Sequence, residues 1–336
     1  MKTLICTTPG QFAYADTQVP ERKQGETLLR IRRVGICGTD LHAYEGTQPF
    51  FQYPRILGHE LAAEIAATDA PGFAGGEYVT IIPYFHCGNC VACKAGKTNC
   101  CAKLSVCGVH EDGGMREYML VPSSSLVKSQ GLGLDELALV EPLAIGAHGI
   151  RRAQIIPGEW VAVIGAGPIG LGVMEFARIA GANVIAVDVQ ENRLQFCTER
   201  LQIPFTINAA KENVSMQLAQ ITHGDMPTVV IDATGNLSAI NESFGYMAHG
   251  GRYVLVGLQK GEIRFPHPGF HQREATLMSS RNATREDFDR VIDALQKGQV
   301  LPLNYITHRV AFAGVKEAFP DWLLPANQVI KAMITI

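Results

Sequence analysis

The most chemically distinctive segment of the chain is a short loop rich in cysteine. Two CxxC steps bring together Cys87, Cys90 and Cys93, and Cys101 follows after seven further residues. This spacing lets three thiolates converge from one tight loop while a fourth closes a tetrahedron, as in structural Zn²⁺ sites. Cys100 is the alternative fourth ligand, although the spacing favours Cys101. Because five of the nine cysteines fall between Cys87 and Cys101 and no secretion signal is evident, we expect metal binding rather than a disulfide framework.

A second set of metal-ligand types is spread over two motifs. Cys37 lies in the motif GICGTD, and His59 and Glu60 form the end of GHE about twenty residues later. A thiolate, an imidazole and a carboxylate supply three protein ligands and leave one position for water or substrate. Taken alone, Cys37 reads equally as a small buried apolar residue and His59 as a structural histidine. Together with the cysteine loop, the two motifs favour a catalytic metal site.

A glycine-rich turn indicates a dinucleotide site. Residues 165–170 fit G-x-G-x-x-G, directly after the apolar run 160–164 and before an expected helix over 169–180. The first glycine makes the turn, the second lets the backbone approach a pyrophosphate, and the third permits close helix–strand packing. The pyrophosphate would then lie at the helix N-terminus. The cofactor-binding residues predicted from this turn are Gly165, Gly167, Pro168, Ile169 and Gly170.

The cofactor is expected to be NAD rather than NADP. Asp188 ends the next apolar strand, 18 residues beyond Gly170, where a carboxylate accepts hydrogen bonds from the adenosine ribose and repels a 2′-phosphate. Arg193 would favour NADP if it binds the 2′-phosphate; the alternative is that it only pairs with Asp188. Two later strand ends are expected to contact adenosine and nicotinamide respectively, with plain turn glycines as the alternative reading. They comprise Ala233, Thr234 and Gly235, and Val256, Gly257 and Leu258.

The elements around these motifs change character along the chain. Up to about residue 145 the sequence is rich in short strands separated by Gly and Pro, with no long helical periodicity. From residue 157 onward, apolar strands alternate with amphipathic helices, which is typical of a doubly wound parallel sheet. The expected strands of the first region are 27–34, 60–68, 78–83 and 117–121. Those of the second are 160–164, 183–187, 228–232 and 253–256, with helices from 169, 192, 237 and 285.

Composition excludes several classes of protein. The 336 residues carry 29 Lys and Arg against 32 Asp and Glu, a formal net charge of −3, so nothing indicates nucleic acid or an anionic membrane as a partner. No apolar run approaches the roughly 20 residues of a membrane helix. The first residues lack the apolar core and cleavage site of a signal peptide. We therefore expect a cytoplasmic protein.

The ordered set GICGTD, GHE, the cysteine loop, EPLA and GAGPIG resembles the zinc-dependent medium-chain dehydrogenases, which include alcohol, sorbitol and threonine dehydrogenases. The resemblance spans essentially the whole chain. It implies a GroES-like β-rich catalytic domain, split around an inserted Rossmann domain, with the active site in the cleft between them. We accordingly expect the catalytic domain over residues 1–146, the NAD-binding domain over 147–285, and a C-terminal segment, 286–336, that rejoins the catalytic domain. The resemblance also implies a dimer or tetramer.

The resemblance assigns roles at the second metal site. Cys37 and His59 match zinc ligands, and the third ligand is either Glu60 or Glu141 of EPLA, where alcohol dehydrogenases have a cysteine. Zinc would polarise the substrate oxygen while a hydride passes to NAD. Thr39 and His42 match a relay that carries the proton to solvent, although Thr39 could equally cap the following helix. Two Zn²⁺ per chain are therefore expected, one catalytic and one structural.

The substrate is expected to be a small hydroxylated molecule. Segments 48–55, 249–251 and 280–284 resemble a bacterial subgroup that oxidises a secondary alcohol of sugar acids, such as the aldonate L-galactonate. The candidate residues for binding such an acid are Tyr44, Arg55, His110 and Arg281. Polyol or L-threonine oxidation is the alternative activity. A non-catalytic nucleotide-binding protein on the same scaffold is disfavoured, because Cys37, His59 and Thr39 are all present.

Overall fold

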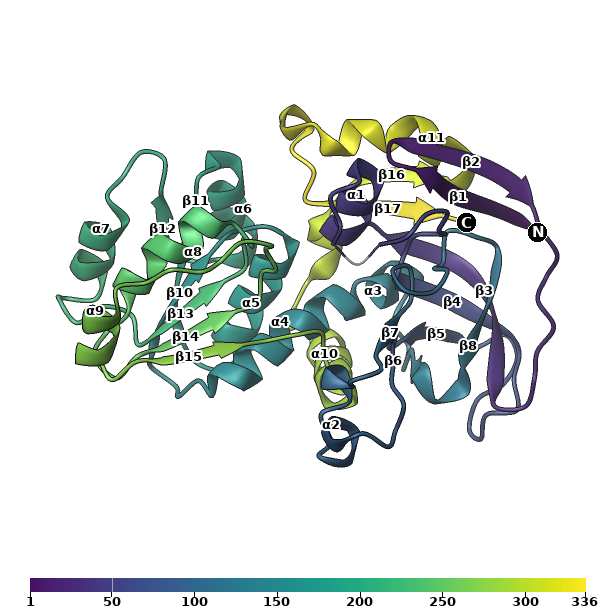
Figure 1. Cartoon of the computed structure of the whole chain (residues 1–336), viewed down its shortest axis with the longest axis horizontal. Coiled ribbons are helices and arrows are strands. Elements are labelled where there is room, and N and C mark those ends of the chain that lie inside the picture. The colour runs from purple at the N-terminus through teal and green to yellow at the C-terminus, as the bar shows by residue number, and fades with distance from the viewer. Residues whose placement is uncertain (50) are drawn as a thin grey trace. The chain divides into compact units, whose positions relative to one another are not determined.

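The computed structural model describes residues 1–49 and 51–336, so Phe50 in the segment 48–55 lies outside it (Figure 1). The chain divides into two compact units, residues 1–142 with 284–336, and residues 143–283. The boundaries expected from the sequence lie after residues 146 and 285, close to these divisions. The first division falls within helix α4 (Val140–Ala153), which contributes residues to both units.

The continuous unit, residues 143–283, is built on one six-stranded sheet in which every pairing is parallel. Its strand order, β12-β11-β10-β13-β14-β15, is the doubly wound order that the sequence predicted. The strands are β10 (Trp160–Ile164), β11 (Asn183–Asp188), β12 (Phe205–Asn208), β13 (Val229–Asp232), β14 (Arg252–Leu255) and β15 (Thr276–Ser279). The helices are α5 (Pro168–Ile179), α6 (Glu191–Leu201), α7 (Val214–Ile221), α8 (Leu237–Ser243) and α9 (His267–Gln272).

The central strands of this sheet are apolar because helices cover the sheet and both of its faces are buried. Val161, Ala162 and Val163 of β10 are fully buried, as are Val229 and Val230 of β13. Because all strands of the sheet are parallel, their carboxyl ends meet at one edge of the sheet. The glycine turn and the later strand ends predicted from the sequence all lie at that edge.

The discontinuous unit holds a mixed sheet in the order β16-β17-β3-β4-β5-β9, with β8 paired to β3. Strand β17 runs antiparallel to β3, so the C-terminal segment rejoins the sheet of the N-terminal region, as expected. The strands are β3 (Glu26–Gly35), β4 (Glu60–Ala67), β5 (Tyr78–Ile81), β8 (Tyr118–Pro122), β9 (Leu126–Lys128), β16 (Ile306–Ala311) and β17 (Lys331–Thr335). Two further strand pairs are β1 (Lys2–Thr8) with β2 (Gln11–Asp16), and β6 (Tyr84–Phe85) with β7 (Ser105–Val106).

Helices in the first 145 residues are the main departure from the sequence prediction. Besides α4, they are α1 (Gly38–Glu45), α2 (Val91–Lys94) and α3 (Leu134–Ala138); α10 (Arg285–Gln296) and α11 (Val315–Ala318) follow near the C-terminus. Helix α4 is mostly buried, but its sequence does carry an amphipathic pattern. It was missed because Pro142, Gly146 and Gly149 weaken the helical signal. None of the described helices is both long and apolar enough to cross a membrane.

Candidate metal and cofactor sites

The cysteine loop, residues 87–101, brings four sulfur atoms together. The Sγ atoms of Cys87, Cys90, Cys93 and Cys101 all lie within 4.8 Å of one another. Individual separations are 3.5 Å for Cys90–Cys93, 3.5 Å for Cys87–Cys101 and 3.9 Å for Cys90–Cys101. A tetrahedral zinc with Zn–S bonds of about 2.3 Å requires sulfur separations of about 3.8 Å. The four thiols therefore fit such an ion, whereas Cys100 is exposed and stands outside the group.

Backbone N–H groups favour thiolates in this loop. The amides of Cys87 and Lys103 both lie 3.3 Å from the Sγ of Cys101. Hydrogen bonds from the backbone of Ala102 and Cys93 lower the pKa of Cys90 to about 6. A thiolate is the form that binds a soft metal, so the local backbone prepares Cys90 as a ligand, whereas desolvation raises the pKa of Cys93 to about 12.

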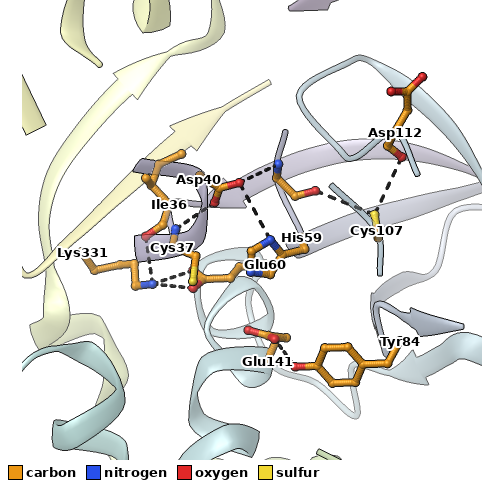
Figure 2. A network of polar contacts seen from close by, with 11 residues as sticks. Ile36, Cys37, Asp40, His59, Glu60, Tyr84, Cys107, Asp112, Glu141 and Lys331 are labelled. Atoms are coloured by element: carbon orange, nitrogen blue, oxygen red, sulfur yellow. Dashed lines mark hydrogen bonds and ion pairs between the residues drawn. The ribbon is translucent and has the colours of Figure 1, made fainter. Parts of the chain in front are cut away.

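The second group of ligand types also converges. One ligand atom from each of Cys37, His59 and Glu60 lies within 4.8 Å of the others, and we call these three residues the metal cluster (Figure 2). Cys37 immediately precedes α1, and Glu60 begins β4 opposite Gly35 of β3. A Cβ atom at residue 35 would collide with Oε2 of Glu60. Glycine at this position therefore makes the room that the Glu60 carboxylate occupies.

Asp40 ties the two halves of the metal cluster together. Its Oδ2 accepts the N–H of Cys37 at 2.9 Å, and its Oδ1 accepts the N–H of Gly58 at 3.0 Å. The same Oδ1 lies 3.8 Å from Nδ1 of His59. Burial opposes the charge on His59, but Asp40, Cys37 and Glu141 together outweigh it and raise the pKa of His59 well above its usual value. The sequence analysis missed this role, although an acid three residues into a helix is a recognisable capping position.

Glu60 is neutralised by a buried lysine. Nζ of Lys331, on β17, lies 2.6 and 2.7 Å from the two oxygens of Glu60 and donates to the carbonyl of Ile36 at 3.0 Å. Both side chains are almost fully buried. Burial opposes the ammonium charge, yet Glu60, with Cys37 and Glu141, outweighs it and raises the pKa of Lys331. The sequence analysis did not identify Lys331, whose signal is a lysine beginning an apolar strand.

Glu141 lies beside the metal cluster in a different environment. The hydroxyl of Tyr84 donates to its Oε1, while its Oε2 is buried with no hydrogen-bond partner among the described residues. Burial raises the pKa of Glu141 to about 7, against the opposing charge of nearby His59. Burial likewise raises the pKa of Tyr84 well above its usual value. Glu141 is not within the 4.8 Å group, but its free oxygen is a donor atom that suits a metal ion.

The two residues of the expected proton relay both lie on α1. Thr39 is in the first turn and is partly buried, while the His42 side chain is 63% exposed. Nδ1 of His42 lies 3.4 Å from a carboxylate oxygen of Glu45 and 3.3 Å from the hydroxyl of Thr47. The helix thus leads from Cys37 to a polar group at the surface.

The expected substrate residues make local contacts. The hydroxyl of Tyr44 donates to the carbonyl of Gly10 at 2.8 Å, and its ring stacks on Phe12. Nη1 of Arg55 lies 3.5 Å from the Asp112 carboxylate, and Nδ1 of His110 accepts the N–H of Val106. These contacts do not involve the metal cluster. Arg281 is exposed and belongs to the other unit.

The glycine turn has the tight geometry expected of a phosphate loop. Gly165 adopts a φ of +100°, which favours glycine, and a Cβ at Gly170 would collide with the carbonyl oxygen of Gly165. Asp188 organises the turn by accepting the N–H of Ala166 at 2.7 Å and that of Gln190 at 2.8 Å. Nη1 of Arg193 lies 3.8 Å from Asp188, so in this structure the arginine pairs with the acid.

The later strand ends are organised by Asp232, which the sequence analysis overlooked. Its fully buried carboxylate accepts the N–H groups of Thr234 and Gly235 at 3.1 and 3.2 Å, and the Thr234 hydroxyl at 2.5 Å. A Cβ at Gly257 would collide with the backbone nitrogen of Gly235. The segments 233–235 and 256–258 therefore meet at the carboxyl ends of β13 and β14, as predicted.

Comparisons with known proteins identify relatives along the whole chain. Residues 23–131 match the alcohol dehydrogenase GroES-like domain, and residues 168–297 match the zinc-binding dehydrogenase domain. L-galactonate-5-dehydrogenase of Escherichia coli (strain K12) is 43% identical over 337 residues, covering 100% of this chain and 99% of the relative. These matches confirm the expected fold class, a GroES-like domain with a doubly wound nucleotide-binding domain.

Solved structures agree with this organisation. The alcohol dehydrogenase rspB from Escherichia coli CFT073, complexed with cofactor NADH, superposes with a TM-score of 0.93 at 32% identity, over 100% of this chain and 99% of that one. L-idonate 5-dehydrogenase from Escherichia coli K-12 MG1655 gives a TM-score of 0.90 at 25% identity, over 100% and 98% of the two chains.

Proposed function

The chain belongs to the zinc-type medium-chain alcohol dehydrogenases and is an oxidoreductase; on that premise we propose that it oxidises a secondary alcohol of a sugar acid, L-galactonate or a neighbouring aldonate, with NAD as hydride acceptor. The observation that carries the substrate assignment is the 43% identity to L-galactonate-5-dehydrogenase over the full length of both chains. The likeness to L-idonate 5-dehydrogenase supports the same substrate class.

The proposed active site is the metal cluster with its neighbours. Cys37 and His59 would hold the catalytic zinc, with Glu60 or Glu141 as the third protein ligand. When bound, this ion supplies a Lewis acid that lowers the proton affinity of the substrate oxygen. Asp40 keeps both ligand segments in place through its hydrogen bonds to Cys37 and Gly58.

The proton released from the substrate hydroxyl needs a path to solvent, which we assign to α1. The hydroxyl of Thr39 accepts the proton as it gives its own hydrogen on toward His42, and His42 releases a proton to water at the surface. The exposed His42 ring, next to Glu45 and Thr47, suits such an exit. A second zinc would be held by Cys87, Cys90, Cys93 and Cys101, with no position left open, so that site stabilises the loop and takes no part in the reaction.

The proposed NAD site is the edge of the parallel sheet. The turn 165–170 receives the pyrophosphate at the N-terminus of α5, and Asp188 accepts hydrogen bonds from the adenosine ribose. Arg193 holds Asp188, segment 233–235 contacts adenosine, and segment 256–258 contacts nicotinamide. The NADH complex of the rspB dehydrogenase supports this choice of cofactor.

The proposed assembly is a homo-oligomer, either a dimer or a tetramer. Strand β15 ends the order of the parallel sheet, so one of its edges is unpaired among the described residues. Such an edge is typically covered by another chain or by a charged surface. The nine free cysteines suit a reducing compartment such as the cytoplasm, where we place the protein. Light scattering on the purified protein measures the assembly.

The test is a reduction assay on purified protein of measured zinc content. NAD or NADP is offered with aldonates, polyols, L-threonine and simple alcohols, and the absorbance of the reduced cofactor is followed. We expect turnover of L-galactonate or a neighbouring aldonate with NAD. Activity confined to polyols or to threonine would remove the sugar-acid assignment and keep the mechanism. Equal rates with NADP would contradict the ribose role of Asp188.

A further inference from the structure

We infer that Tyr84 is a positioning residue of the active site: its phenol fixes the Glu141 carboxyl group, so that the remaining oxygen is presented to the metal cluster. This inference rests on the proposed function, because it assigns a task to a residue within the proposed zinc site. Tyr84 lies outside all of the motifs that identify the family.

The arrangement of the two side chains carries the inference. Tyr84 is 4% exposed and Glu141 is 1% exposed, and the hydroxyl of the first donates to Oε1 of the second (Figure 2). Oε2 of Glu141 is buried and has no hydrogen-bond partner in the described part of the chain. Buried polar atoms nearly always have partners, so this oxygen is open to a bound group that completes its hydrogen bonds or ligation. Here that group is the metal ion or the substrate hydroxyl beside it.

Glu60 and Glu141 differ in how many of their oxygens remain free to accept a hydrogen bond or bind a metal ion. Both oxygens of Glu60 already contact the ammonium group of Lys331. Glu141 instead receives one hydrogen bond from a neutral phenol, which fixes the orientation of the carboxyl group and occupies only one of its oxygens. The free oxygen can accept a hydrogen bond from the substrate hydroxyl or bind the metal directly.

The phenol itself is rigidly held. Tyr84 pairs with Val106 in the short β6–β7 ladder, and the amide of Cys107 donates to the carbonyl of the preceding Pro83 at 3.0 Å. On its other side the ring packs edge-on near Phe288 of α10, with centroids 6.4 Å apart. The hydroxyl therefore has little freedom to leave Glu141, which is what a positioning residue requires.

The first test is Tyr84→Phe in the full-length protein, which removes one oxygen atom and keeps the ring. Cobalt is exchanged into the site, its visible absorption is recorded, and the part lost in Cys37→Ser identifies the bands of this site. We expect altered bands, metal affinity about 10-fold weaker in competition with a chromophoric chelator, and kcat lowered by a similar factor. Tyr253→Phe is the matched control, since it removes a buried hydroxyl bonded to Ser243 in the other unit and should leave the bands unchanged.

The second test places the same change in a Glu141→Gln background. If Tyr84 acts through Glu141, Tyr84→Phe adds little to the spectral and affinity changes that Glu141→Gln already causes. Parental bands and affinity in Tyr84→Phe would overturn the inference, as would an undiminished effect in the Glu141→Gln background. The metal readouts do not depend on the substrate, so an inactive substrate panel would contradict only the proposed function.

Discussion

The cysteine loop takes all of its sulfur atoms from residues 87–101, whereas the metal cluster depends on side chains as far apart as Glu60 and Lys331, separated by 271 positions. Backbone N–H groups within and next to the loop support its thiolates. Buried charged side chains from α1 and β17 support the metal cluster. The cysteine loop, which leaves no ligand position free and which we call the closed site, can thus form wherever its loop folds. The metal cluster, which leaves a position for substrate and which we call the open site, depends on the surrounding fold for its geometry.

The largest expected effect is on the closed site. Cys90→Ser should remove about one zinc per chain and lower the free energy of unfolding by at least about 5 kcal/mol, because the binding energy of a structural metal is folding energy. Zinc analysis and urea denaturation measure both. The matched control is Cys100→Ser, which changes an exposed thiol outside the four-sulfur group and should keep both zinc ions. If Cys100→Ser lost zinc instead, Cys100 and not Cys101 would be the fourth ligand.

Cys37→Ser should affect activity strongly and stability little, the reverse of Cys90→Ser. We expect loss of about one zinc and at least a ~10³-fold fall in kcat/KM, about 4 kcal/mol of transition-state stabilisation, because the Lewis acid is no longer held. Relative to parental protein whose open site has been emptied of zinc, the free energy of unfolding should change by less than about 1 kcal/mol, since the stabilisation by the bound ion is then absent from both proteins. Unfolding of the variant would mean that the structural and catalytic assignments are exchanged.

Lys331→Met tests how strongly the fold supports the open site. Removing one partner of a buried ion pair leaves the other charge uncompensated, so we expect the free energy of unfolding to fall by about 3 kcal/mol in zinc-free protein. If Glu60 binds the metal, the loss should be smaller with zinc present.

The controls for that change are one double variant and one exposed pair. Adding Glu60→Gln to Lys331→Met should restore part of the stability. Lys297→Met breaks an exposed ion pair with Asp293 and should cost less than about 0.5 kcal/mol. If Lys297→Met lowered the free energy of unfolding as much as Lys331→Met does, burial of the Glu60–Lys331 pair would not explain the effect.

The smallest expected effect separates the two sites by affinity alone. Asp40→Asn weakens the support of Cys37 and His59 and should lower zinc affinity at the open site about 10-fold, or about 1.4 kcal/mol. The closed site should keep its affinity in the same chelator competition. An unchanged affinity at both sites would show that the Asp40 charge does not hold the cluster together.

The same contrast explains what could be predicted from the sequence. The cysteine loop, the glycine turn and Asp188 were recognised because their geometry depends on short spacings that stay visible in the chain. Tyr84 and Lys331 were not recognised, because each acts on a carboxylate that is brought near only by the folded unit. Asp40 and Asp232 carry a weak local signal, an acid at the start of a helix and an acid at the end of a strand. Helix α4 was missed because Pro142, Gly146 and Gly149 weaken the helical signal on which the prediction depends.

The pairing of β17 with β3 has a consequence for the order in which the molecule forms during synthesis. Residues 143–283 are one continuous segment and leave the ribosome before Lys331 is made. Glu60 is present from early in synthesis, but its counter-ion arrives only with β17, after that whole unit is available to fold. Until then a strand position beside Gly35 is unpaired and a carboxylate destined for burial is uncompensated. The open site is therefore completed after the nucleotide-binding unit has been synthesised.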